Sequence, residues 1–66
     1  MSRKNFIAIA AQIRRTITDI RALDVSDITK QAQLEGTFRT VEGLCCVFSD
    51  QNPGFDSARF LNACGM

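Results

Sequence analysis

Three cysteines are the most reactive side chains in this sequence of 66 residues. Cys45 and Cys46 are adjacent, Cys64 lies near the end of the chain, and the sequence contains no histidine. Structural zinc sites need four such ligands, typically in closely spaced pairs, and an odd number of cysteines does not make a disulfide framework. We therefore expect no metal site, and we expect free, buried thiols in a reducing compartment.

The sequence also predicts no catalytic site. Histidine, the commonest general base, is absent, and no group near Cys45 would lower the pKa of its thiol. Four acidic residues are expected either at helix starts or on a solvent-facing side: Asp24, Asp27, Glu35 and Glu42. No glycine-rich loop suited to binding phosphate is present. We expect no enzyme activity and no cofactor.

The charged residues are distributed unevenly along the chain. Residues 1–21 hold five basic side chains and one acidic one, whereas residues 22–66 hold three basic and six acidic ones. Such segregation favours a charged partner or pairing with a second copy of the chain. The candidate partner-binding residues are Arg14, Arg15 and Arg21.

Nucleic acid is the alternative partner of these basic residues, because arginines can contact phosphates. Two features of the composition oppose it. The sequence pI of about 7.7 is lower than the value above about 9 that is typical of nucleic-acid-binding domains. Neither Trp nor Tyr is present to stack on bases.

The first predicted helix runs from about Arg3 to Ile20, with Ser2 as its N-cap. Its apolar residues recur at steps of three and four: Phe6, Ile9, Ile13, Ile17 and Ile20. This spacing places them on one helical face and does not fit the period of two of a strand. The basic residues fall on the other side.

The second predicted helix runs from about Asp27 to Phe48, and Asp24 or Ser26 is its cap. Its apolar stripe consists of Leu34, Phe38, Val41, Cys45 and Phe48. Two glycines interrupt this helical pattern, and each costs roughly 1 kcal/mol relative to alanine. One interpretation is a close helix crossing; the alternative is a kink at Gly36 that divides the segment.

Small residues line one face of this second helix: Ala32, Gly36, Gly43 and Val47. Because missing side chains let two helices approach closely, we expect this face to be a contact surface. Its partner is either the first helix or a second copy of the chain.

The end of the chain predicts a short third helix from about Ser57 to Cys64. Asp56 suits the N-cap, since its carboxylate can accept hydrogen bonds from the first turn. Phe55 and Phe60 have the spacing of a hydrophobic staple, and Gly65 suits a left-handed helix terminator. We expect this helix to close one end of an all-α hairpin made by the two longer helices.

The length of the chain allows one domain, residues 1–66. A domain of this size buries only about 60% of its unfolded surface, so we expect a homodimer or larger assembly. No apolar run approaches the roughly 18 residues of a membrane span. Arg14 and Arg15 interrupt the N-terminal apolar segment too early for a signal peptide. We expect a soluble, cytoplasmic protein.

Both ends of the chain carry motifs. The start reads Ser2-Arg3-Lys4-Asn5-Phe6, and the end reads Asn52-Pro53-Gly54-Phe55-Asp56, then Arg59-Phe60-Leu61 and Ala63-Cys64-Gly65. They resemble a group of small proteins of tailed phages and prophages, which open with Met-Thr-Arg-Lys-Asp-Tyr and close with Asn-Pro-x-Phe-Asp-x-x-Arg-Phe-Leu-x-Ala-Cys-Gly. Asn5 and Phe6 replace the Asp-Tyr of that group. The group has no established activity, so the resemblance implies no catalytic residue.

The resemblance implies a phage context, in which small non-catalytic proteins often act by binding one host protein. We therefore expect a helical interaction protein that binds and inhibits a host protein, with an antiviral defence component of the CRISPR type as the favoured target. One alternative is a small nucleic-acid-binding regulator that uses the first helix. Another is a minor virion or assembly component.

Overall fold

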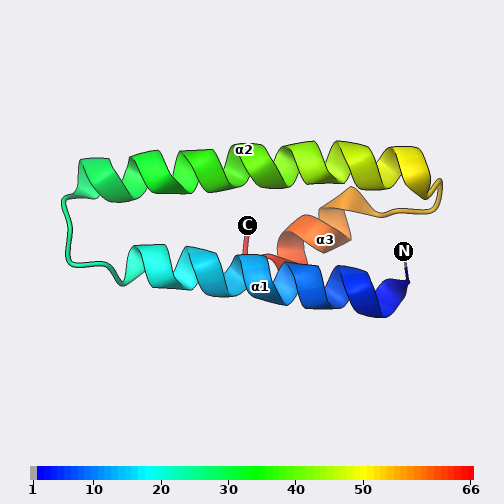
Figure 1. Ribbon diagram of the computed structural model, residues 1–66, viewed down its shortest axis with the longest axis horizontal. Coiled ribbons are helices and arrows are strands. Elements are labelled where there is room, and N and C mark those ends of the chain that lie inside the picture. The colour runs from blue at the N-terminus through cyan, green and yellow to red at the C-terminus, as the bar shows by residue number, and fades with distance from the viewer. Residues whose placement is uncertain (1) are drawn as a thin grey trace.

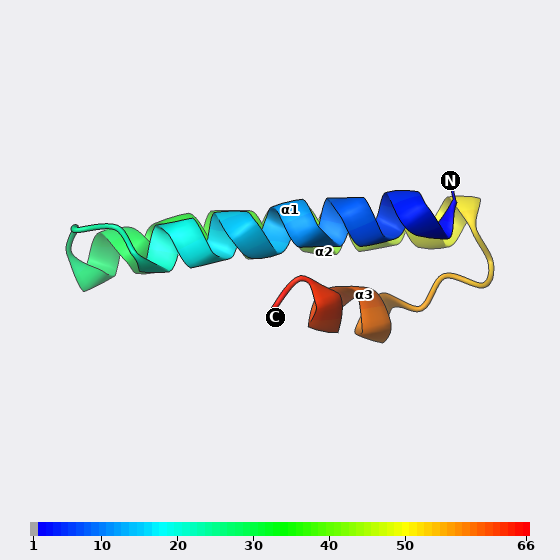
Figure 2. The same cartoon turned by 90° about the horizontal axis from the view of Figure 1, so that it is seen from below.

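A computed structural model describes residues 2–66 as three helices and no strand. The helices are α1 (Arg3–Arg21), α2 (Asp27–Gln51) and α3 (Ser57–Ala63). α1 and α2 run antiparallel as a long hairpin, and α3 lies on one face of it (Figures 1 and 2). The predicted all-α fold, two longer helices followed by a short third one, is confirmed.

α1 begins where the sequence predicts and ends one residue later than expected. Ser2 occupies the N-cap position, but its side chain makes no capping hydrogen bond. The backbone carbonyl of Ser2 accepts instead from the N–H groups of Asn5 and Phe6, at 3.0 and 3.3 Å. Ile17 and Ile20 of the apolar stripe are buried, so packing of this face holds the β-branched residues in a helix.

α2 is one continuous helix, as predicted, and the alternative of a division at Gly36 is wrong. Ser26, not Asp24, caps it, because the N–H of Thr29 donates to Ser26 Oγ at 3.3 Å. The helix continues three residues beyond the predicted end to Gln51. It stops there because Pro53 follows and disfavours helical dihedrals at Asn52, whose backbone is extended.

A tight turn carries the chain from α2 to α3. The N–H of Phe55 donates to the carbonyl of Asn52 at 2.9 Å, with Pro53 at the second position of the turn, where its fixed φ is favoured. Asp56 then caps α3, because the N–H of Arg59 donates to its carboxylate at 3.1 Å. The predicted cap is confirmed.

The end of α3 is also as predicted. Gly65 has a φ of +84°, the left-handed conformation that glycine adopts without strain. The N–H of Gly65 donates to Asn62 O at 3.0 Å, and the N–H of Met66 donates to Leu61 O at 3.1 Å. These two bonds form a Schellman motif. α3 ends at Ala63, one residue before the predicted Cys64.

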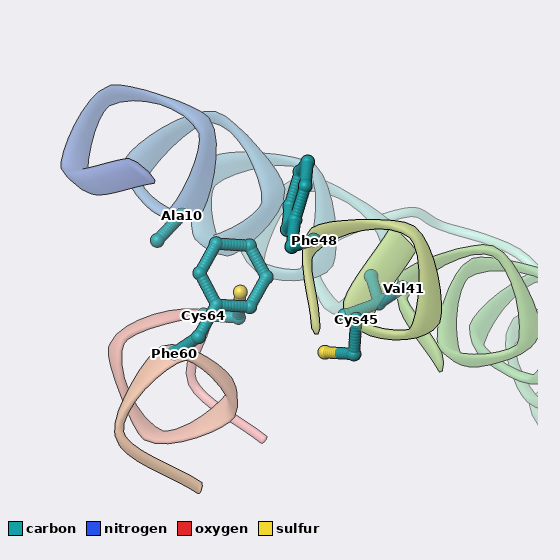
Figure 3. Packing of buried hydrophobic residues seen from close by; sticks show 6 residues of the cluster. All are labelled: Ala10, Val41, Cys45, Phe48, Phe60 and Cys64. Carbon is teal, nitrogen blue, oxygen red and sulfur yellow. The ribbon is translucent and has the colours of Figure 1, made fainter. Parts of the chain in front are cut away.

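Side chains from all three helices form the buried core, which Figure 3 shows from close by. Its buried members are Ala10, Val41, Cys45, Phe48, Phe60 and Cys64. Four phenylalanines meet at this place: Phe6, Phe48, Phe55 and Phe60. Their ring centroids lie 5.0 to 6.5 Å apart in every pairing, the range of favourable aromatic contacts. The Phe55–Phe60 pair, at 5.5 Å, is the predicted hydrophobic staple.

α3 covers only one half of the hairpin (Figure 2). The molecule measures 40 × 18 × 15 Å, and α3 lies at the end that holds the start of α1 and the end of α2 (Figure 1). The prediction that α3 closes one end of the hairpin is only partly right, because α3 packs on one face of that half and not across its end. The other end consists of α1, α2 and the connection between them.

Candidate interaction surfaces

The first candidate surface is the basic side of α1, where sequence analysis placed the partner-binding residues. Arg14, Arg15 and Arg21 are all exposed. Arg14 and Arg21 lie two helical turns apart on the same side, about 10.5 Å along the axis, and Arg15 is rotated about 100° from Arg14. The three guanidinium groups therefore follow the helix as an extended surface and do not converge on one point.

Arg14 also contacts α3, which the sequence did not reveal. A Cβ added to Gly65 would lie 3.5 Å from Cγ and 3.9 Å from Nε of Arg14. The arginine stem therefore lies against the end of α3, where the negative end of the helix dipole favours a cation. Arg14 thus supports the packing of α1 against α3. The other two predicted residues, Arg15 and Arg21, are exposed charges on the surface of α1.

The small-residue face of α2 does not contact another part of the chain. Ala32, Gly36 and Gly43 are exposed, Val47 is 48% exposed, and a Cβ added to either glycine would meet no atom within 4 Å. The predicted close crossing with the first helix is wrong, because the apolar stripe around Val41 turns the opposite side of α2 toward α1 and α3. Contact with a second copy through this face stays a prediction.

An apolar groove lies between the first half of α1 and the segment that forms α3. Its volume is about 490 Å³, within the range of about 300–1,000 Å³ that is usual for ligand sites. Its lining includes Phe6, Phe55 and Phe60 together with the exposed arginines Arg3 and Arg59. We call it the Phe groove.

Sequence analysis did not find the Phe groove. The staple of Phe55 and Phe60 and the early position of Phe6 were each visible, but only the tertiary fold brings them together. Ile7 also lines the groove and is 60% exposed. On the helix Ile7 lies on the basic side, off the apolar stripe of α1, and that position was the available signal.

A second apolar surface lies at the connection between α1 and α2, which we call the hairpin tip (residues 23–28). Leu23 is 39% exposed, Val25 43% and Ile28 83%. Asp24 and Asp27 alternate with them and are exposed as well. The tip is therefore an apolar knob carrying two acidic residues, at a place where sequence analysis expected only a link and a helix start.

Two of the three cysteines are packed in the core. Cys45 of α2 and Cys64 of α3 are buried, whereas Cys46 is exposed, and the close view shows Cys45 and Cys64 within one core (Figure 3). Burial raises the pKa of the Cys45 thiol, as do Cys46 and Glu42 nearby. Burial and then the neighbouring Cys45 raise the pKa of Cys64. Both buried thiols are thus held protonated and unreactive.

Within residues 2–66, no three acidic or cysteine side chains are grouped so as to hold a metal ion. None of the helices in this range has the length and apolar character needed to cross a bilayer. No protein family, curated protein or solved structure matches the chain. Function is therefore inferred from the surfaces of the molecule: the basic side of α1, the Phe groove and the hairpin tip.

Proposed function

We propose that this protein is a non-catalytic interaction module whose basic α1 surface binds an acidic surface of a host protein. The observation that carries the proposal is that α1 holds five basic side chains, all exposed, against a single acidic one, Asp19. The basic residues are Arg3, Lys4, Arg14, Arg15 and Arg21. Exposed charge of one sign speeds the encounter with an oppositely charged partner and selects against others.

Arginine suits this role better than lysine does. Its planar guanidinium pairs with carboxylates in a bidentate geometry, and arginines are frequent among the residues that dominate interface energies. Arg15 and Arg21 are the residues we place in the contact, with Arg14 beside them at the end of α3. The resemblance to phage proteins favours an antiviral defence component, of the CRISPR type, as the protein that is bound and inhibited.

The test compares wild-type protein with the variant Arg15→Glu/Arg21→Glu. Arg39→Glu on α2, also exposed, is the matched control. Expression of the wild type or the control in a host with an active CRISPR system should raise plaque formation by a targeted phage, and the variant should not. The purified wild type should bind the defence complex, and the variant should bind it at least about tenfold more weakly, since one like-charge contact costs several kcal/mol.

Unchanged plaque formation in all three strains would contradict the proposal. So would equal binding by the variant and the wild type. Gel shifts with DNA and RNA at several salt concentrations address the nucleic-acid alternative. A shift that weakens steeply with salt and disappears in the variant would show that the basic surface serves phosphates instead.

A further inference from the structure

We infer that the hairpin tip of one copy of this protein docks into the Phe groove of a second copy. The hairpin tip and the Phe groove are both apolar surfaces, one projecting and the other hollow. The tip projects three apolar side chains, Leu23, Val25 and Ile28, into solvent. The groove offers a mainly apolar lining that includes three phenylalanines, and its volume is sufficient to receive such side chains. Exposed apolar surface of this kind gains free energy when it is covered.

The charges of the two surfaces are complementary. The tip carries two exposed carboxylates, Asp24 and Asp27, and the groove carries two exposed guanidinium groups, Arg3 and Arg59. The groove also contains the carboxylate of Asp56, which caps α3, so two positive charges and one negative leave the groove with a net charge of +1. An acidic apolar segment therefore fits the groove, whereas a basic one would meet like charge.

The tip cannot fill the groove of its own molecule. The connection between α1 and α2 lies at one end of the 40 Å hairpin, and the groove lies at the other, where the described chain starts (Figure 1). The tip of a second copy can reach the groove, because it is not held at the far end of the same hairpin. A contact between two different surfaces is heterologous, so it either closes as a pair with two equal contacts or continues as a chain of copies.

This contact differs from the one predicted from sequence, which used the small-residue face of α2. That face offers no apolar side chain larger than Val47 among its four residues. The tip and the groove instead combine apolar surface and opposite charge on one chain. The self-association shares only Arg3 with the basic side of α1, whereas the host-binding contact is placed at Arg15 and Arg21.

The experiment is a reciprocal charge swap measured by sedimentation equilibrium. The tip variant is Asp24→Lys/Asp27→Lys, which keeps the apolar side chains, and the groove variant is Arg3→Glu/Arg59→Glu. Both groove substitutions suit their helices, because an acid is favourable in the first turn and the Arg59→Glu change would complete a capping box with Asp56. Arg39→Glu is a control that changes an exposed charge elsewhere, on α2.

We expect the wild type and the control to self-associate, and each swap variant alone to do so at least about tenfold more weakly because like charges then face each other. A one-to-one mixture of the two swap variants should regain association, since Lys-bearing tips then face Glu-bearing grooves. Circular dichroism melts establish that each variant is folded. A labelled peptide with the sequence of residues 22–29 should bind the folded tip variant and not the groove variant.

Three results would overturn the inference. The wild type could sediment as a monomer up to millimolar concentration. The folded swap variants could associate as strongly as the wild type, or their mixture could stay monomeric. Alternatively, Gly36→Leu/Gly43→Leu could abolish association that both swap variants retain, which would assign the contact to the outer face of α2.

Discussion

The two halves of the hairpin are built differently. In the half that holds α3, three helices meet and four phenylalanines pack together, so that Phe48 and Phe60 are buried. In the half that ends at the tip, two helices share a narrow seam around Ile17 and Ile20, and Ile28 is 83% exposed. A chain of this size concentrates its burial where three elements meet. The other half keeps apolar side chains at the surface, where a partner can cover them.

The largest expected effect comes from removing an aromatic ring from the three-helix half. Phe60→Ala should lower the free energy of unfolding by about 3–5 kcal/mol, because Phe60 is 5% exposed and contacts three other rings. That is a large part of the roughly 3–10 kcal/mol expected for a domain of this length. Urea unfolding followed by circular dichroism measures the loss, or shows that the variant does not fold.

The matched control in the tip is Ile28→Ala, also a large-to-small change in a helix. Because Ile28 is 83% exposed, its removal should change the free energy of unfolding by less than about 0.5 kcal/mol at a concentration where the protein is monomeric. Equal losses in Phe60→Ala and Ile28→Ala would mean that the two halves contribute alike, and the comparison would fail.

A smaller loss of stability is expected from N-cap substitutions, and it should differ between the starts of α3 and α1. Asp56→Ala removes the carboxylate that accepts the Arg59 N–H at the start of α3, and it should cost about 1 kcal/mol. Ser2→Ala changes a residue in the same position of α1, but the Ser2 side chain makes no capping bond. Its expected cost is only a few tenths of a kcal/mol. Thermal melts of both variants, side by side, give the comparison, and a larger loss from Ser2→Ala would contradict the described capping.

The outer face of α2 should respond in the opposite direction. Gly36→Ala and Gly43→Ala each place a methyl group where no atom lies within 4 Å. Each should therefore raise the free energy of unfolding by up to about 1 kcal/mol through helix propensity. Chemical denaturation of the single variants checks the sign. A loss of stability that grows with protein concentration would show that this face is covered by another copy.

Much of the fold follows from local sequence patterns. Periodicity predicts all three helices within three residues at each end, and capping residues such as Asp56 and Gly65 predict the boundaries of α3 within one residue. These features depend on neighbours in sequence, so they are visible before the chain is folded. The alternative of a kink at Gly36 stayed open in the sequence because the energetic cost of a glycine in a helix does not show whether packing of the rest of the helix outweighs it.

The surfaces are harder to predict because they depend on how helices are placed relative to one another. The small residues of α2 stand out in the sequence, yet the sequence does not decide which side of the helix is covered. Arg14 is predicted as a partner-binding residue, and its contact with Gly65 forms only when α3 folds back along α1. The exposed apolar surface of the hairpin tip was not predicted. Residues 22–25 have the composition of a loop, and the turn-forming residues that identify a loop do not show how exposed its apolar side chains are.

Residue-resolved hydrogen exchange at low protein concentration tests the difference between the two halves most directly. Leu34 lies seven residues from the start of α2, and Phe48 lies three residues from its end, so fraying alone would protect Leu34 better. The described packing predicts the reverse, with the amide of Phe48 exchanging through global unfolding and that of Leu34 through a lower-energy opening of the tip half. Equal protection, or stronger protection at Leu34, would contradict a fold held together mainly at its three-helix end.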